Sequence, residues 1–209
     1  MRRILNDICF FRGERVSIAN LNLDSYISTE NMLPNKEGLS RSSGLPTIAS
    51  TQAYHTKDVL VSNIRPYFRK IWFADRDGGC SNDLLVFKAK DNCCSGFLYY
   101  LLSDDSFFDY MTATAKGTKM PRGDKGAIMR YEVPDLPLEV QVEIAATLSC
   151  LDERISINKA VNHHLSGSMP ETGSSPDIRR GKRVSRRVAK RADSSRFTRI
   201  CSNIGVVAA

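Results

Sequence analysis

The longest regular pattern of apolar and polar positions along the chain covers residues 137–165. Its seam positions recur at alternating intervals of four and three residues, a heptad spacing that keeps them on one side of an α-helix. These positions are Ile144, Leu148, Leu151, Ile155, Asn158, Asn162 and Leu165. At ~1.5 Å per residue the helix would be roughly 43 Å long. A rod with so narrow an apolar seam normally packs against a second helix, so we predict one long C-terminal α-helix of coiled-coil type.

Before residue 137 the apolar positions come in short runs separated by turn residues, which is typical of strands in a mixed, partly antiparallel sheet. The predicted strands are residues 14–20, 57–62, 70–74, 84–89 and 128–133. Helical spacing predicts two short helices at 97–102 and 106–111, with a cap between them at residues 103–105. Residues rich in Gly, Pro, Asn and Asp predict loops at 24–50, 63–67, 77–79 and 116–126. The pattern as a whole predicts an α+β fold.

Charge divides the chain into a balanced part and a basic tail. Residues 1–165 hold 20 basic and 20 acidic side chains, whereas residues 166–209 hold 10 basic and 3 acidic ones. The net charge of +7 therefore lies in the tail, whose arginine-rich composition without an apolar face predicts disorder. We expect a folded domain over residues 1–136, the long helix over 137–165 and the tail over 166–209.

Composition also bounds the cellular setting. No run approaches 18 apolar residues, so we expect no membrane contact. The six cysteines contain no C-x-x-C pair and suit reduced thiols in a cytoplasmic protein.

Patterns typical of catalysis are missing from the sequence. Five residues separate Gly117 from Gly123, not the four of a phosphate-binding loop, and no Lys-Ser or Lys-Thr pair follows them. His163 and His164 are adjacent, so they point to different faces of a helix and do not form a two-ligand metal site. We therefore expect no catalytic residue, no metal and no cofactor in this chain.

Two basic clusters are candidates for contacts with DNA. One surrounds the turn at residues 63–67 and mixes cations with aromatic side chains, and the other lies on the glycine-containing loop at 116–126. The candidate DNA-binding residues are Arg65, Tyr67, Arg69, Lys70, Lys116, Lys119 and Arg122. Cations on loops that brace a sheet can reach phosphates, and Arg can recognise guanine through two hydrogen bonds. The alternative is that the aromatic side chains belong to the core and the charges form a solvated surface.

Two segments, residues 58–89 and 133–165, resemble the target-recognition domain of type I restriction–modification specificity subunits. That family combines an Asn-x-x-Arg-Pro turn and a Ser-Asn/Thr-Asp strand entry with a Pro-x-x-x-Gln helix entry and a Leu-Asp-Glu-x-Ile helix core. The matching positions are Asn63, Arg65, Pro66, Ser81, Asn82, Asp83, Pro137, Gln141, Leu151, Asp152, Glu153 and Ile155. The resemblance covers roughly residues 4–165, and the order and spacing of these motifs make it specific.

The resemblance implies a non-catalytic subunit that binds double-stranded DNA. Each recognition domain of the family reads one half of a bipartite site, and the long helices set the distance between the halves and dock methyltransferase subunits. Those subunits methylate adenine with S-adenosylmethionine, and a separate motor-nuclease subunit cleaves unmodified DNA. The subunit contacts would be made by the helix entry and seam, through Gln141, Ile144, Leu148, Leu151 and Ile155.

The chain departs from the family in having one recognition domain and one long helix where a full member has two of each. We therefore expect a half-subunit or a truncated copy. A half-subunit would work if two copies paired through the helix as a homodimer, which would give a symmetric DNA site. Two alternatives stay open: a helix-mediated protein-interaction module that does not bind DNA, and a decayed copy that cannot assemble.

Overall fold

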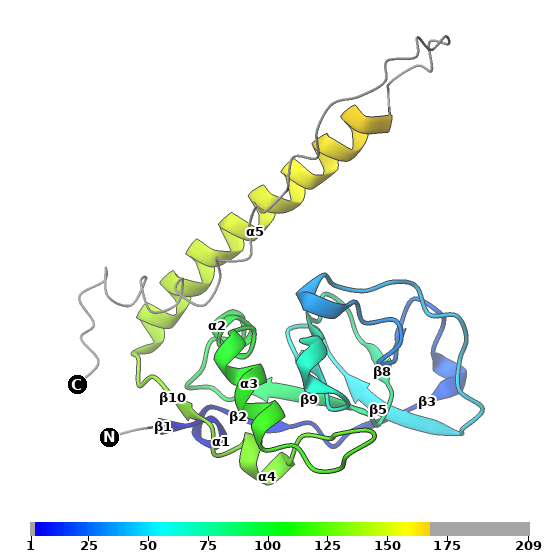
Figure 1. Ribbon diagram of the computed structural model, residues 1–209, viewed down its shortest axis with the longest axis horizontal. Coiled ribbons are helices and arrows are strands. Elements are labelled where there is room, and N and C mark those ends of the chain that lie inside the picture. Colours follow the sequence, from blue (N-terminus) through cyan, green and yellow to red (C-terminus); the bar gives the residue numbers. More distant parts are fainter. Residues whose placement is uncertain (1–2, 168–209) are drawn as a thin grey trace, which may run out of the picture.

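Two four-stranded sheets and a two-stranded ribbon form the sheet part of the chain in the computed structural model, which describes residues 3–167 and their side chains as far as residue 162 (Figure 1). The predicted basic tail, apart from its first two residues, lies outside the described residues. A group of helices packs against the first sheet, and one long helix, α5 (Leu138–Gly167), projects away from it.

The first sheet consists of antiparallel strands in the order β2 (Cys9–Phe11), β9 (Leu84–Ala89), β6 (Val59–Ser62) and β7 (Ile71–Phe73). Its central strands are apolar at consecutive positions because both faces of the sheet are covered, and successive side chains point to opposite faces. In β6, Val59 and Val61 join the core cluster beneath the helices, whereas Leu60 joins a smaller cluster on the other face. The predictions of strands at 57–62, 70–74 and 84–89 are confirmed.

The second sheet has the order β3 (Arg15–Ser17), β5 (Ser50–Tyr54), β8 (Gly78–Cys80) and β4 (Tyr26–Ile27), with only the β4–β8 pair parallel. The turn predicted at 77–79 is wrong, because Gly78 and Gly79 begin β8. A Cβ atom at Gly78 would lie 2.2 Å from the carbonyl oxygen of Ser25, and one at Gly79 would lie 2.5 Å from Leu21. Glycine is therefore used in β8 for close approach of neighbouring chain segments, not for a turn.

The helices α2 (Ser95–Leu102) and α3 (Asp105–Ala113) confirm the two predicted short helices. Asp104 caps α3 by accepting a hydrogen bond of 2.8 Å from the backbone N–H of Ser106. The buried side chains of these helices fill the main core: Phe97, Leu98, Leu101, Leu102, Phe107, Phe108 and Met111. Each contributes ~1.5–3 kcal/mol relative to an exposed position, so α2 and α3 account for much of the domain's stability.

Two sequence predictions fail near the chain ends of this domain. The strand predicted at 128–133 is reduced to β10 (Glu132–Val133), because Asp124 caps a short helix, α4 (Lys125–Ile128), just before it. The strand predicted at 14–20 stops after β3, where a 3₁₀ turn, η1 (Ile18–Asn20), begins. No pattern of apolar positions predicted the N-terminal ribbon, in which β1 (Arg3–Ile4) pairs with β10 and leads into α1 (Leu5–Ile8).

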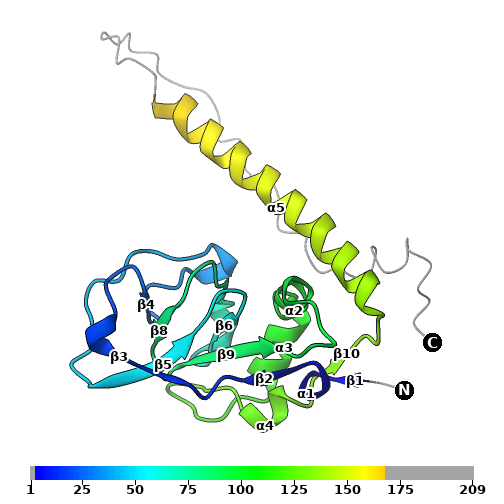
Figure 2. The same ribbon diagram turned by 180° about the vertical axis from the view of Figure 1, so that it is seen from behind.

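Helix α5 is 30 residues long, or about 45 Å at ~1.5 Å per residue. The buried contacts of α5 with the domain lie in its first turns: Ile144 and Ala145 are buried against α2, and residues 149–162 are all exposed. Figures 1 and 2 show the rest of the helix standing clear of both sheets. Among the described helices, none combines the length and the apolar composition that a membrane crossing requires.

Candidate nucleic-acid interface

The turn between β6 and β7 has an unusual backbone. It contains the 3₁₀ helix η3 (Pro66–Phe68), and the residues on either side of it, Arg65 and Arg69, have φ values of 49° and 52°. A left-handed conformation costs a residue with a Cβ atom roughly 1–2 kcal/mol, so packing around the turn must hold it in place. Backbone strain of this kind clusters at binding and catalytic sites, which makes the turn a candidate site.

The loop at residues 116–126 is hydrogen-bonded to this turn. Lys116 and Arg122 exchange two backbone hydrogen bonds, of 2.8 and 2.9 Å, which close the loop on itself. The backbone N–H of Arg65 then donates to the carbonyl oxygen of Pro121 at 2.9 Å, and that of Gly123 donates to Asn63 at 3.1 Å. Two basic clusters that are far apart in the sequence therefore form one continuous surface, which we call the turn–loop surface (residues 63–70 and 116–126).

Three side chains of the turn–loop surface are exposed and available to a ligand. The side chains of Arg65 and Lys119 form no hydrogen bond or ion pair with any residue the structure describes, and Tyr67 is 50% exposed. The ring of Tyr67 lies 4.8 Å from that of Phe68, which is itself 40% exposed. The alternative that the aromatic side chains belong to the core therefore applies to the half-buried Trp72, but not to Tyr67 and Phe68.

Lys116 and Arg122 each pair with an acidic side chain of the chain itself. The Lys116 ammonium lies 2.5 Å from Asp124, and the Arg122 guanidinium lies 2.9 Å from Asp83. The Lys116 hydrogen bond, together with two backbone N–H groups of α4, lowers the pKa of Asp124 to about 2. Because exposed pairs are worth only ~0–1 kcal/mol, a phosphate can replace either carboxylate at little cost.

The side chains of Arg69 and Lys70 are half-buried and have partners within the chain, so their predicted contact with DNA stays a prediction. The Arg69 guanidinium pairs with Asp105 of α3 at 2.9 Å, and the Lys70 ammonium donates to the carbonyl oxygen of Thr29 at 2.6 Å. Burial lowers the pKa of Lys70. Their geometry is that of side chains that hold the turn in position.

Sequence reasoning missed two residues that support the turn. Asp105 accepts the Lys36 ammonium at 2.8 Å as well as Arg69, so it links α3, η3 and the loop around η2 (Pro34–Lys36). Lys36 also donates its backbone N–H to the carbonyl oxygen of Arg69 at 3.0 Å. An acidic residue in the first turn of a helix is ordinary, so the sequence held no signal for this role.

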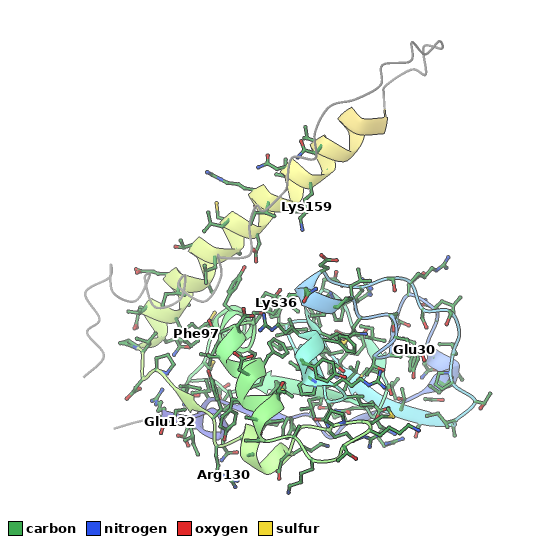
Figure 3. The ribbon with its side chains drawn as sticks, in the orientation of Figure 1. Glu30, Lys36, Phe97, Arg130, Glu132 and Lys159 are labelled. Atoms are coloured by element: carbon green, nitrogen blue, oxygen red, sulfur yellow. The ribbon has the colours of Figure 1, made fainter. Side chains whose placement is uncertain are left out.

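The predicted subunit-contact residues divide into a buried and an exposed group. Gln141 and Ile144 are each 2% exposed, so they are buried by residues of this chain, and their contact with another subunit stays a prediction. Leu148 is half-buried, and Leu151 and Ile155 are 44% and 40% exposed. Leu148 and Ile155 also line a cleft of about 490 Å³ between α5 and the domain, where Lys36 and Lys159 face the same opening (Figure 3).

Among the described side chains, no group of three or more His, Cys, Asp and Glu residues is arranged to hold a metal ion. The side chains of His163 and His164 lie outside the described part. The closest arrangement to a reactive cluster is His55, whose ring nitrogens lie 3.1 Å from Asp77 and 3.0 Å from Glu14. This cluster lies beside the strands of the second sheet.

The fold and the turn–loop surface define the class of the protein. The model of the type I restriction modification DNA specificity domain matches residues 5–166, and the chain belongs to that family. Among curated proteins, it is 28% identical over 149 residues to the type I restriction enzyme EcoDI specificity subunit of Escherichia coli. The match covers 67% of this chain and 33% of that protein, so the chain spans about a third of the length of this relative.

Two solved structures share the fold. The HsdS subunit from Thermoanaerobacter tengcongensis superposes with a TM-score of 0.61 at 21% identity, over 79% of this chain and 45% of that one. A chain from a structure that describes complex assembly and conformational transition of the type I R-M system gives the same TM-score and identity, over 85% of this chain and 51% of that one. The predicted α+β recognition domain with a long C-terminal helix is thereby confirmed. The family and the curated relative are specificity components, in agreement with the prediction of a non-catalytic chain.

Proposed function

We propose that this chain reads one half of a bipartite site on double-stranded DNA and has no catalytic centre of its own. The observation that carries the proposal is the set of backbone hydrogen bonds that joins the turn to the loop, which leaves the exposed side chains of Arg65, Tyr67 and Lys119 without a hydrogen bond or ion pair to any described residue. Membership of the DNA specificity domain family supports it independently.

The chemistry of the turn–loop surface suits both parts of DNA recognition. Arg65 can donate two hydrogen bonds to a guanine edge in the major groove, which is the commonest specific contact. Lys119, together with Lys116 and Arg122 once they leave their carboxylate partners, can hold phosphates and set the register of the domain on the duplex. Tyr67 supplies a half-exposed ring that can pack against the sugar–phosphate backbone or position the turn.

We further propose that helix α5 pairs two copies of the chain. Its exposed seam residues Leu151 and Ile155 would pair with α5 of a second copy and so join two half-sites in one symmetric site. A pair of this kind would dock methyltransferase subunits and, through them, the motor-nuclease subunit. S-adenosylmethionine would belong to the methyltransferase, and the assembly would work in the cytoplasm, where its DNA is found.

A salt titration of DNA binding tests the proposal. The binding site is first selected from a library of random duplexes, and the titration uses a form of the chain that ends at Leu165, because the basic tail could bind DNA non-specifically. Logarithmic affinity should fall linearly with logarithmic salt concentration, with a slope of about −0.9 per phosphate contacted. Lys119→Ala should reduce the magnitude of this slope by about 1.

A matched control comes from Arg41, an exposed arginine that pairs with Asp24 in another loop of the chain. Arg41→Ala should leave the slope unchanged. If the selection yields no preferred sequence and binding does not depend on salt, the chain does not read DNA, and the role of a helix-mediated interaction module is favoured instead.

A further inference from the structure

The joint between the domain and α5 is built around one buried amide. The elbow before the helix, residues 133–137, contains two prolines, and Gln141 lies at the end of the first helical turn that follows. The Gln141 side chain is a neutral polar group that is 2% exposed, in a position where the family resemblance led us to expect a contact with another subunit.

The side-chain amide of Gln141 joins three separate segments. Its Nε2 donates to the carbonyl oxygen of Leu136 in the elbow at 2.9 Å and to that of Asn92 at 3.3 Å. Its Oε1 accepts the backbone N–H of Cys94 at 3.0 Å. Cys94 is the N-cap residue of α2, and its own side chain makes no capping hydrogen bond. Gln141 therefore uses both of its donors and connects the elbow, the loop before α2 and the start of α2 to the first turn of α5.

Apolar packing next to Gln141 leaves little room for an alternative arrangement. Ala145, one turn further along α5, lies against Gly96 of α2, where an added Cβ atom would approach Ala145 to 3.2 Å. Ile144 is buried in the same core. Beyond Leu148, the Tyr100 hydroxyl donates an exposed hydrogen bond to Asp152 at 3.0 Å. The direction of α5 is therefore set within its first three turns.

A small change in the angle of α5 at this joint would produce a large displacement at the far end of the helix. From Gln141 to Ala160 the helix rises about 28 Å, so a tilt of ~10° would move residue 160 by about 5 Å. This displacement exceeds the ~3.4 Å between successive base pairs of a DNA strand. A protein that joins two half-sites through α5 therefore needs a joint that tolerates only a few degrees of variation.

We propose that Gln141 is the positioning residue of this joint, which fixes the direction in which α5 leaves the recognition domain and thereby the separation of the two half-sites that the assembled protein reads. The part that concerns half-sites rests on the proposed function. The part that concerns the helix direction does not, and the two can be tested separately.

Distances between spin labels test the helix direction in the full chain. One label is attached at Lys88→Cys, on the exposed face of β9, and the other at Ala160→Cys, near the far end of α5. Cys94→Ala, Cys150→Ser and Cys201→Ser remove competing thiols, while Cys9, Cys80 and Cys93 are buried and stay. The parent protein should give one narrow distance distribution.

Gln141→Leu keeps the side-chain size but removes all three hydrogen bonds, and it should broaden the distribution or shift its centre by about 5 Å. Glu143→Gln, an exposed change on the same helical turn, should leave the distribution unchanged. An unchanged distribution in folded Gln141→Leu protein would overturn the proposal. If Gln141→Leu does not fold, Gln141→Met is used instead. It removes the same hydrogen bonds with an unbranched side chain closer in shape to glutamine, and the same criterion applies to it.

Two further measurements separate positioning from general stability and from DNA reading. Tyr100→Phe removes only the exposed brace to Asp152 and should change the distribution less than Gln141→Leu does; an equal or larger change would assign the positioning role to Tyr100 instead. The affinity of the full chain for one half-site should stay within twofold of the parent in Gln141→Leu. Loss of half-site binding together with an unchanged label distance would contradict the positioning role and leave the helix direction to the apolar contacts alone.

Discussion

The backbone N–H of Arg65 donates to the carbonyl oxygen of Pro121 at 2.9 Å. This hydrogen bond holds Arg65 in a left-handed conformation and ties the turn after β6 to the loop that carries Lys119. Because the bond involves only backbone atoms, the Arg65 side chain is left free. Replacing that side chain should therefore change binding without changing the fold.

Arg65→Ala should reduce the affinity for DNA, whereas Arg69→Ala should reduce the stability of the fold. Arg65→Ala should weaken binding to the selected duplex by ~1–3 kcal/mol, with relaxed specificity at one base pair, and leave the free energy of unfolding nearly unchanged. Arg69→Ala should lower the free energy of unfolding by about 1 kcal/mol, because it removes the ion pair with Asp105. Fluorescence anisotropy and urea unfolding measure the two quantities. Equal losses of affinity without loss of stability would show that both side chains contact DNA.

Gly123→Ala should loosen the turn–loop surface. A Cβ atom at this buried position would lie 2.9 Å from Oδ1 of Asn63 and 3.0 Å from both Met111 and Ile128. Oδ1 of Asn63 is buried and has no hydrogen-bond partner in the described structure, so the added methyl group would crowd an oxygen that is already unsatisfied.

We expect Gly123→Ala to lower the free energy of unfolding by ~1–3 kcal/mol, as overpacking generally does, and to weaken DNA binding with it. Hydrogen exchange of the Arg65 and Gly123 amides would report the loosened loop. Gly44→Ala is the matched control, because nothing lies within 4 Å of its added Cβ atom. Similar exchange rates in both variants would refute the prediction.

The sequence predicted the elements that are marked by a continuous pattern and missed those that depend on a neighbour. β6, β9 and α5 were predicted closely, because burial on two faces and a heptad seam both leave a strong periodic signal. β8 was missed because its glycines are required by the close approach of Ser25 and Leu21. This approach depends on the tertiary structure and leaves no local pattern in the sequence.

In the candidate site, too, the features marked by local composition could be predicted, and those that depend on residues distant in the sequence could not. Both basic clusters could be recognised from composition, but their union depends on backbone hydrogen bonds between residues that are distant in the chain. The directions of Arg65 and Arg69 could not be predicted either, since both lie on one turn and both have left-handed backbones. The positions of Asp105 and Asp109 in α3, which both pair with Arg69, decide where its side chain lies.

Asp58→Ala should be among the most destabilising single substitutions in the domain. Asp58 is 2% exposed and pairs with Arg12, which is 7% exposed, through two hydrogen bonds of 2.6 and 3.1 Å. Asp58→Ala leaves the buried Arg12 guanidinium with only the exposed Glu14 as a partner, at 2.6 Å, and breaking a buried pair costs roughly 3–5 kcal/mol. Asp24→Ala is the control, since its pair with Arg41 is mostly exposed and is worth only ~0–1 kcal/mol. Urea unfolding that gave equal losses for the two variants would contradict the burial argument.

The cluster around His55 should make stability depend on pH. Hydrogen bonds with Asp77, and secondly with Glu14, raise the pKa of His55 in the folded state. The protonated His55 therefore adds fully to the free energy of unfolding below the unfolded-state pKa of about 6.5, and this stabilisation is lost as pH rises through the folded-state pKa. Hydrogen bonds from the backbone N–H of Thr56, and secondly from His55, lower the pKa of Asp77 to about 2. The stabilisation that the ionised Asp77 provides is therefore lost as pH falls toward 2. The cluster should therefore stabilise the domain most between about pH 4 and 6.5.

His55→Gln tests this window, because glutamine can replace a hydrogen bond but cannot become charged. The difference in free energy of unfolding between the parent and His55→Gln should be largest near pH 5.5 and should shrink by about pH 8.5. Because the His55 side chain is 42% exposed, added salt should reduce the difference at the lower pH. A difference that stays constant across this range would show that His55 acts only through hydrogen bonds or packing.

Ile155→Asp should abolish pairing of two copies through α5. Ile155 lies on the apolar seam with Leu151, and both are about 40% exposed in the single chain, so pairing would bury them further. If each Ile155 gains ~1.5 kcal/mol on burial, loss of both copies from a dimer removes about 3 kcal/mol, which is more than a hundredfold in Kd. Sedimentation equilibrium measures this change directly. Ser149→Asp places the same charge on α5 away from the seam and should leave the dissociation constant within a few fold of the parent. Equal weakening by both variants would mean that added negative charge, not the seam, controls the association.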